Sequence, residues 1–194
     1  RIEAHPEKVE LKWEEGTVTL AYADSDTLLI SGRGKGAGIR LDFLPGEAFD
    51  FIQPVLSGKD TWYLADCFKN YMRYMLFNQA GRIALHQEWK VSNSEFCQLD
   101  VLEENGEFLL VLEEVRDSWI NRNISYDIQE VCRNAREDFE RFYQSMPSVP
   151  EEYEDAREKA SYVNWSSIVN KLSLLKRDAM FMSKNWMCNV WSWD

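Results

Sequence analysis

Aromatic side chains gather in the last fifteen residues of the chain, 180–194, which read MFMSKNWMCNVWSWD and close on a carboxylate, Asp194. Three of the eight tryptophans lie here, together with three of the six methionines. A tryptophan side chain offers roughly 150–250 Å² for burial, so three tryptophans together require a partner surface. The stretch stops at Asp194 without a turn signal, a cap or a polar tail. We therefore expect the natural polypeptide to continue beyond Asp194 and this chain to be its front part.

The order of residues in this stretch resembles the entry to the catalytic barrel of family 63 glycoside hydrolases. These enzymes belong, with the trehalases, to a wider (α/α)6-barrel group of glucosidases. The resemblance rests on an aromatic run that closes in Trp-x-Trp-Asp and that follows a helix and a Lys-Asn-Trp. The matching residues are Ser183, Lys184, Asn185, Trp186, Trp191, Ser192, Trp193 and Asp194.

The resemblance implies roles for two of these residues, Trp191 and Asp194. In the resembling enzymes the closing Asp hydrogen-bonds sugar hydroxyls in the subsite of the departing glucose, and the first Trp lines that subsite. Charge-assisted hydrogen bonds of this kind are roughly twice as strong as neutral ones. The alternative for all three tail tryptophans is simple core packing, which we expect for Trp186 and Trp193. The family's catalytic acid and base lie further along the chain, so no catalytic residue is assigned here and the chain alone is expected to be inactive.

Paired carboxylates elsewhere in the chain do not identify a catalytic site. Inverting glycosidases need an acid and a base about 6.5–9.5 Å apart, and 33 acidic residues offer too many pairs to choose from. Glu103-Glu104 and Glu113-Glu114 look paired, but neighbouring residues in a strand point to opposite faces. We interpret both pairs as charges at hairpin edges.

A glycine-rich stretch and the cysteines are also interpreted structurally. Residues 32–38 read GRGKGAG, but a nucleotide site would need a helix to follow, whereas residues 39–43 alternate like a strand. The four cysteines are widely spaced, and the only histidines are His5 and His86. Zinc sites usually draw on close ligand pairs, so we expect no metal and free thiols in a reducing compartment. The cysteines are Cys67, Cys97, Cys132 and Cys188.

The composition limits the classes of partner. A net charge of −11 argues against nucleic acid and against an anionic membrane surface. The chain contains no run of about 18 apolar residues, so we expect no segment to span a bilayer. We expect a cytoplasmic protein without a cofactor, although a chain that begins at Arg1 leaves a signal peptide open.

Residues 9–115 alternate between apolar and polar types in short segments, which predicts an antiparallel β-sandwich. Asn105-Gly106 is the strongest hairpin signal, because both residues tolerate positive φ, and residues 78–81 predict a second hairpin. Residues 46–59 are less regular, and Pro54 argues against a central strand there. We interpret that region as an apolar turn over the sandwich.

From Asp127 the apolar spacing changes to three and four, which predicts an amphipathic helix. Ser125 and Asp127 are candidate caps, with Glu130 placed as in a capping box. A second helix should start near Pro150 and run to about Val169, with small residues such as Ala156 and Ala160 in close packing. The expected domains are a β-sandwich at 1–124, a helical linker at 125–150, and the truncated start of an (α/α)6 barrel at 151–194.

The sequence is compatible with two functions. The first is the non-catalytic β domain and linker of an inverting enzyme acting on α-glucosides, which would support the barrel and shape the rim of its cleft. The second is a stand-alone carbohydrate-binding or protein-interaction β module. The sugar and its linkage stay undetermined. With its later helices missing, the tail is expected to pack on another copy, fold back on the β domain, or be sticky and poorly ordered.

Overall fold

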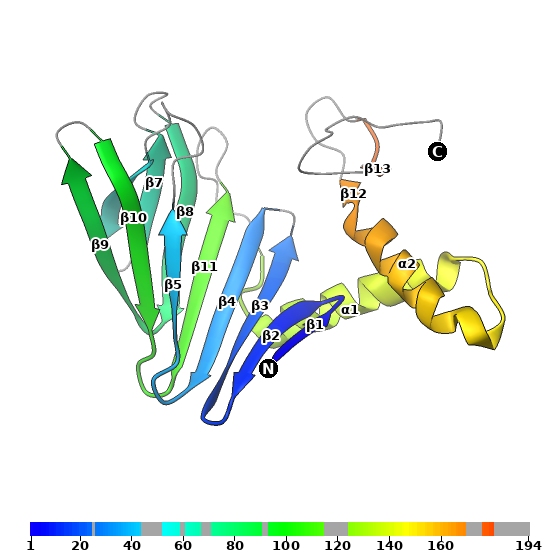
Figure 1. The fold of residues 1–194 in the computed structure, drawn as a ribbon. Coiled ribbons are helices and arrows are strands. Elements are labelled where there is room, and N and C mark those ends of the chain that lie inside the picture. Colours follow the sequence, from blue (N-terminus) through cyan, green and yellow to red (C-terminus); the bar gives the residue numbers. More distant parts are fainter. Residues whose placement is uncertain are drawn as a thin grey trace. The chain divides into compact units, whose positions relative to one another are not determined.

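The protein is an antiparallel β-sandwich followed by two helices, as the sequence predicts (Figure 1). The computed structural model describes residues 1–24, 26–43, 52–58, 61–66, 71–90, 93–114, 124–169 and 176–180. The chain divides into two compact units, Arg1–Cys132 and Arg133–Asp194. The predicted boundaries at 124 and 150 stay predictions.

The larger sheet of the first unit has eight antiparallel strands in the order β1-β2-β3-β4-β11-β8-β7-β6. Its strands are β1 (Ile2–His5), β2 (Lys8–Trp13), β3 (Gly16–Asp24), β4 (Thr27–Gly34), β11 (Glu107–Glu114), β8 (Tyr71–Ala80), β7 (Thr61–Asp66) and β6 (Ile52–Gly58). The smaller sheet has the order β5-β10-β9, with β5 (Gly38–Phe43), β10 (Asn93–Leu102) and β9 (Arg82–Lys90).

The main core lies between the two sheets, because alternate residues of each strand point to the same side. The larger sheet contributes residues such as Val18, Ile30 and Leu110, and the smaller sheet contributes Leu99 and Val101. All five are at most 4% exposed. We call the face of the larger sheet that carries this core its inner face, and the opposite face its outer face.

The outer face of the larger sheet has a smaller core of its own. Ala21, Leu29 and Val111 pack there against Ile128 and Val131 from the start of helix α1 (Ile128–Ser145). Burial of this apolar strip fixes where the first turn of α1 meets the sheet. The rest of the outer face, over β1 to β4, stays polar.

The tight turn predicted at Asn105-Gly106 is confirmed, but the flanking strands β10 and β11 lie in different sheets and do not form the predicted hairpin. Both residues have positive φ, 56° and 84°, and Glu104 and Glu107 exchange backbone hydrogen bonds across the turn. The Glu103 carboxylate accepts hydrogen bonds from the backbone N–H groups of Gly106 and Gly36, which lower the pKa of Glu103. The turn joins β10 of one sheet to β11 of the other.

We expect Gly106→Val to lower the free energy of unfolding by about 1 kcal/mol or more, because a β-branched residue resists positive φ. Gly106→Asn is the matched control, since asparagine tolerates this conformation and should cost less. Denaturant unfolding of the three proteins measures the difference. Equal midpoints for the valine variant and the wild type would contradict the conformational role of Gly106.

Three other sequence-based interpretations of the sandwich are wrong. Residues 52–58 form strand β6 rather than an apolar turn, and Pro54 is accommodated because β6 is an edge strand. The predicted hairpin at residues 78–81 is absent, because β8 and β9 flank Gly81 but lie in different sheets. Glu113 is no edge charge: it is 1% exposed on β11 and accepts a hydrogen bond of 3.0 Å from the Tyr126 hydroxyl.

The predicted helices are present, but the second ends at Ser166 rather than near Val169, because residues 168–169 form a short strand. The Asp127 carboxylate caps α1 by accepting hydrogen bonds from the backbone N–H groups of Gln129 (2.8 Å) and Glu130 (3.4 Å). The capping box is incomplete, because the Glu130 carboxylate accepts a hydrogen bond from the Ser125 hydroxyl instead of from the Asp127 backbone. A 3₁₀ turn, Glu151–Tyr153, precedes α2 (Glu154–Ser166), and a short ladder joins β12 (Ile168–Val169) to β13 (Ala179–Met180).

Ala156 and Ala160 on α2 are exposed, so the predicted close packing of this face is not observed among the described residues. In the part of the chain that the structure describes, no helix is both long enough and apolar enough to cross a bilayer.

Candidate functional site

The two predicted substrate-binding residues, Trp191 and Asp194, lie outside the described residues. The other residues that carry the resemblance, from Ser183 onward, lie outside them as well. Their roles stay predictions. Two polar arrangements that the sequence reasoning missed are described instead, and both lie on the outer face of the larger sheet.

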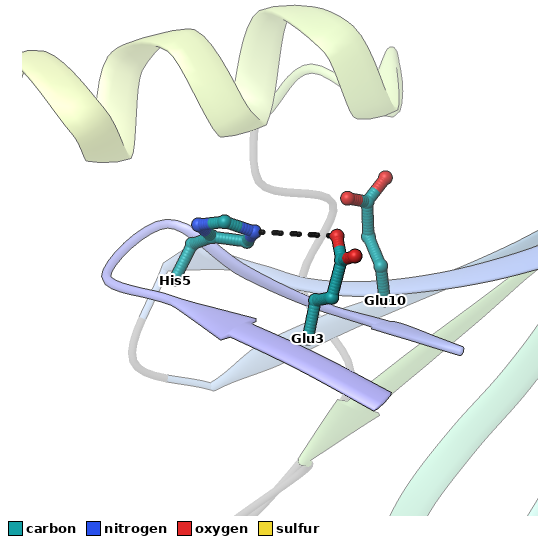
Figure 2. A group of neighbouring side chains, drawn as sticks. All are labelled: Glu3, His5 and Glu10. Atoms are coloured by element: carbon teal, nitrogen blue, oxygen red, sulfur yellow. Dashed lines mark ion pairs between the residues drawn. The ribbon is translucent and has the colours of Figure 1, made fainter. Parts of the chain in front are cut away.

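The first arrangement is a cluster of Glu3 and His5 on β1 and Glu10 on β2 (Figure 2). Their potential ligand atoms all lie within 4.8 Å of one another, and His5 Nε2 is 3.9 Å from Glu3 Oε2. Antiparallel pairing sets Glu3 directly opposite Glu10. Two carboxylates and an imidazole are a donor set that a divalent cation can use.

Lysine side chains already neutralise these carboxylates. The Lys12 ammonium lies 2.7 Å from Glu3 Oε2 and 3.2 Å from Glu10 Oε2, and Lys8 lies 3.2 Å from the same Glu10 oxygen. A cation between the two carboxylates would have to displace Lys12. We therefore interpret the cluster as a structural ion-pair network that fastens the edge strand β1 to β2.

The network shifts the protonation of its members. The hydrogen bond from Lys12 is the largest influence on Glu3 and lowers the pKa of that carboxyl. Partial burial acts to raise the pKa of Glu10, but hydrogen bonds from Lys12 and Lys8 outweigh it, so that this pKa is lowered too. The same bonds, to Glu3 first and then to Glu10, raise the pKa of Lys12.

These shifts predict a pH-dependent effect of Glu3→Gln. Because the pKa of Glu3 is lower in the folded protein than in the unfolded chain, its ionised form stabilises the fold at pH values above the unfolded-state pKa, near 4.5. This stabilisation is lost as the pH falls through the folded-state pKa. The wild type should therefore melt above the variant at pH 7, by a few degrees at most, and together with it at pH 2. Glu15→Gln, in the exposed turn after β2, is the control. A difference that persists at pH 2 would contradict this interpretation.

The second arrangement is a groove on the outer face of β2, β3 and β4, with a volume of about 230 Å³. The lining consists mainly of polar side chains together with the first turn of α1: Glu10, Thr17, Thr19, Ser31, Arg33, Ile128 and Gln129. Strand register sets Thr19 opposite Ser31 and Thr17 opposite Arg33. Only the pairing of three strands brings these residues together, and their period-two spacing was the sequence signal available.

The helical unit contains an aromatic cluster that is structural. Phe139 is 2% exposed, and its ring lies 5.6 Å from that of Trp165 and 6.1 Å from that of Tyr143. The Arg157 guanidinium lies 4.1 Å from the centre of the Tyr143 ring and donates to the backbone carbonyls of Tyr143 and Met146. These contacts hold α1 and α2 together.

Comparison of the sequence with models of known protein families finds no match, and comparison with curated proteins finds none either. Function must therefore be inferred from the residues themselves and from the resemblance at residues 183–194.

Proposed function

We propose that this chain is the N-terminal, non-catalytic part of a glycoside hydrolase that acts on α-glucosides with inversion. In this proposal the β-sandwich supports an (α/α)6 barrel and shapes the rim of its cleft. Trp191 and Asp194 bind the departing glucose, and the catalytic acid and base come from later residues of the enzyme. The substrate is a carbohydrate, and no cofactor is required.

The observation that carries the proposal is the order of the elements. The resemblance at residues 183–194 implies an antiparallel β domain, then helices, then the barrel. The chain has an antiparallel sandwich followed by two helices, in that order along the sequence. A parallel sheet with crossover helices would have removed this support.

Further support comes from an uncovered part of the inner face of the larger sheet. Ile2 is 70% exposed, Trp13 44% and Tyr22 63%, although all three point to the side that carries the main core. Large exposed apolar patches mark interaction surfaces. A domain that supports a catalytic barrel needs such a surface.

The same uncovered surface favours a second candidate, a stand-alone interaction module that binds another protein. The length of the open reading frame beyond Asp194 separates the two candidates. Several hundred further residues with helical periodicity would support the enzyme. A stop codon within a few residues would support the module.

Activity provides the direct test. The full-length product of the gene should release glucose from an α-glucoside, with β-glucose appearing first in proton NMR spectra, as inversion requires. The 194-residue chain should release none above a blank. The proposal fails if the longer protein leaves a panel of α-glucosides intact, or if the 194-residue chain hydrolyses one by itself.

A further inference from the structure

We propose that the groove on the outer face of β2, β3 and β4 binds a neutral polyhydroxylated ligand, of the size of one sugar ring. This inference goes beyond the proposed glucosidase and does not rest on it, because binding in the groove needs neither the barrel nor Asp194.

Unused hydrogen-bonding groups on neighbouring strands are the first reason. Among the described residues, the hydroxyl groups of Thr17, Thr19 and Ser31 and the guanidinium of Arg33 make no side-chain hydrogen bond or ion pair. Strand register places them as two facing pairs, Thr17 with Arg33 and Thr19 with Ser31. Hydroxyl groups both donate and accept, so this arrangement matches the alternating donors and acceptors of a sugar.

Carboxylates and cations balance around the groove, which favours a neutral ligand over an anion. Glu10 lines one side and faces Thr19 across the β2–β3 pairing, and its carboxylate is paired with Lys8 and with Lys12, which faces Thr17. Arg33 lies on the other side, and Glu107 is directly opposite it on β11. Two N–H groups at the start of α1, those of Gln129 and Glu130, would otherwise attract an anion but are already bonded to the Asp127 carboxylate. Because the lysines contact the Oε2 atom of Glu10, a sugar can donate to its Oε1 atom and accept from Arg33 at the same time.

The shape of the groove limits the size of the ligand and its affinity. A volume of about 230 Å³ is below the range of roughly 300–1,000 Å³ typical of drug-sized sites. Ile128 supplies an apolar wall, but no aromatic ring lines the groove. We therefore expect weak binding, with a dissociation constant of about 1–10 mM.

Titration of the ¹⁵N-labelled 194-residue chain with glucose and with maltose tests the proposal. We expect saturable shifts of the amide signals of residues 17–19, 31–33 and 128–129. The double variant Thr19→Val, Ser31→Ala removes two hydroxyl groups with little change of volume and should weaken binding about 5- to 50-fold. Tyr22→Phe is the matched control, because it removes a hydroxyl from the inner face of the same strand and should leave binding unchanged.

Arg33→Gln provides a second, independent variant. Arg33 is exposed, so the change should leave the fold intact even if the double variant unfolds, and it should weaken sugar binding several-fold. Inorganic phosphate forms the other arm of the titration. The proposal is overturned if neither sugar shifts these amides up to about 100 mM. It is also overturned if phosphate binds with a lower dissociation constant than either sugar in this titration. The same holds if neither the double variant nor Arg33→Gln weakens sugar binding.

Discussion

Replacing Phe108 with alanine is expected to lower the free energy of unfolding of the sandwich by about 3–5 kcal/mol. The Phe108 side chain is 1% exposed and belongs to the core between the two sheets. It lies on β11 directly opposite Gly32 of β4, and a Cβ atom built on Gly32 would come within 2.0 Å of the Phe108 ring. The ring therefore occupies the space that the missing side chain of Gly32 leaves open.

The packing of the Phe108 ring against Gly32 predicts that substitutions at these two positions are energetically coupled. Gly32→Ala alone should destabilise by about 1–3 kcal/mol, because the new methyl group collides with the ring. In the Phe108→Ala background, the same methyl group enters a cavity and should cost much less, or even restore stability. The double-mutant cycle should therefore show a coupling of about 1 kcal/mol or more.

Denaturant unfolding measures all four proteins, with Tyr22→Ala as the surface control. Tyr22 is 63% exposed on β3, so its truncation should cost less than about 1 kcal/mol. A loss below about 1.5 kcal/mol for Phe108→Ala, or strict additivity of the two changes, would mean that the ring and Gly32 are not packed as described.

The parts of the fold that the sequence predicts are those set by local requirements. Asn105-Gly106 identifies its turn because the turn itself demands positive φ. The alternation of residues such as Val18 and Leu20 identifies strands because one face is buried. Asp127 caps its helix through atoms only two and three residues away. None of these features depends on a distant part of the chain.

The parts that the sequence does not predict depend on how strands pair. Gly81 separates two strands as a hairpin turn would, but whether they pair or enter different sheets is decided by β11 and β10, which lie further along the chain. Glu113 looks like an edge charge until the central place of β11 in the sheet is known. The groove needs the register of β2, β3 and β4 to bring Thr19 and Ser31 together. Trp191 and Asp194 were assigned by resemblance, and their roles stay predictions.

In the proposed full-length enzyme, Asp194→Asn is expected to reduce kcat/KM for an α-glucoside about 100-fold or more. The variant keeps the shape of the side chain but loses the charge that strengthens its hydrogen bonds to sugar hydroxyls. A hydrogen bond to a charged group contributes about 1.5–3 kcal/mol, and a 100-fold loss corresponds to about 2.7 kcal/mol. Trp191→Ala should reduce kcat/KM as well, because it removes the aromatic face that covers the pyranose.

Asp155→Asn is the matched control for the charge. Asp155 lies on α2 with its side chain 79% exposed and paired with Lys159, so its variant should keep the activity of the wild type. Thermal melting separates binding from packing, because a binding residue changes kcat/KM without lowering the melting temperature. If Asp194→Asn retains activity within about threefold of the wild type, or loses activity and stability together, the Trp-x-Trp-Asp motif packs the chain rather than binding glucose. The assignment of this chain to a glucosidase would then lose its main chemical support.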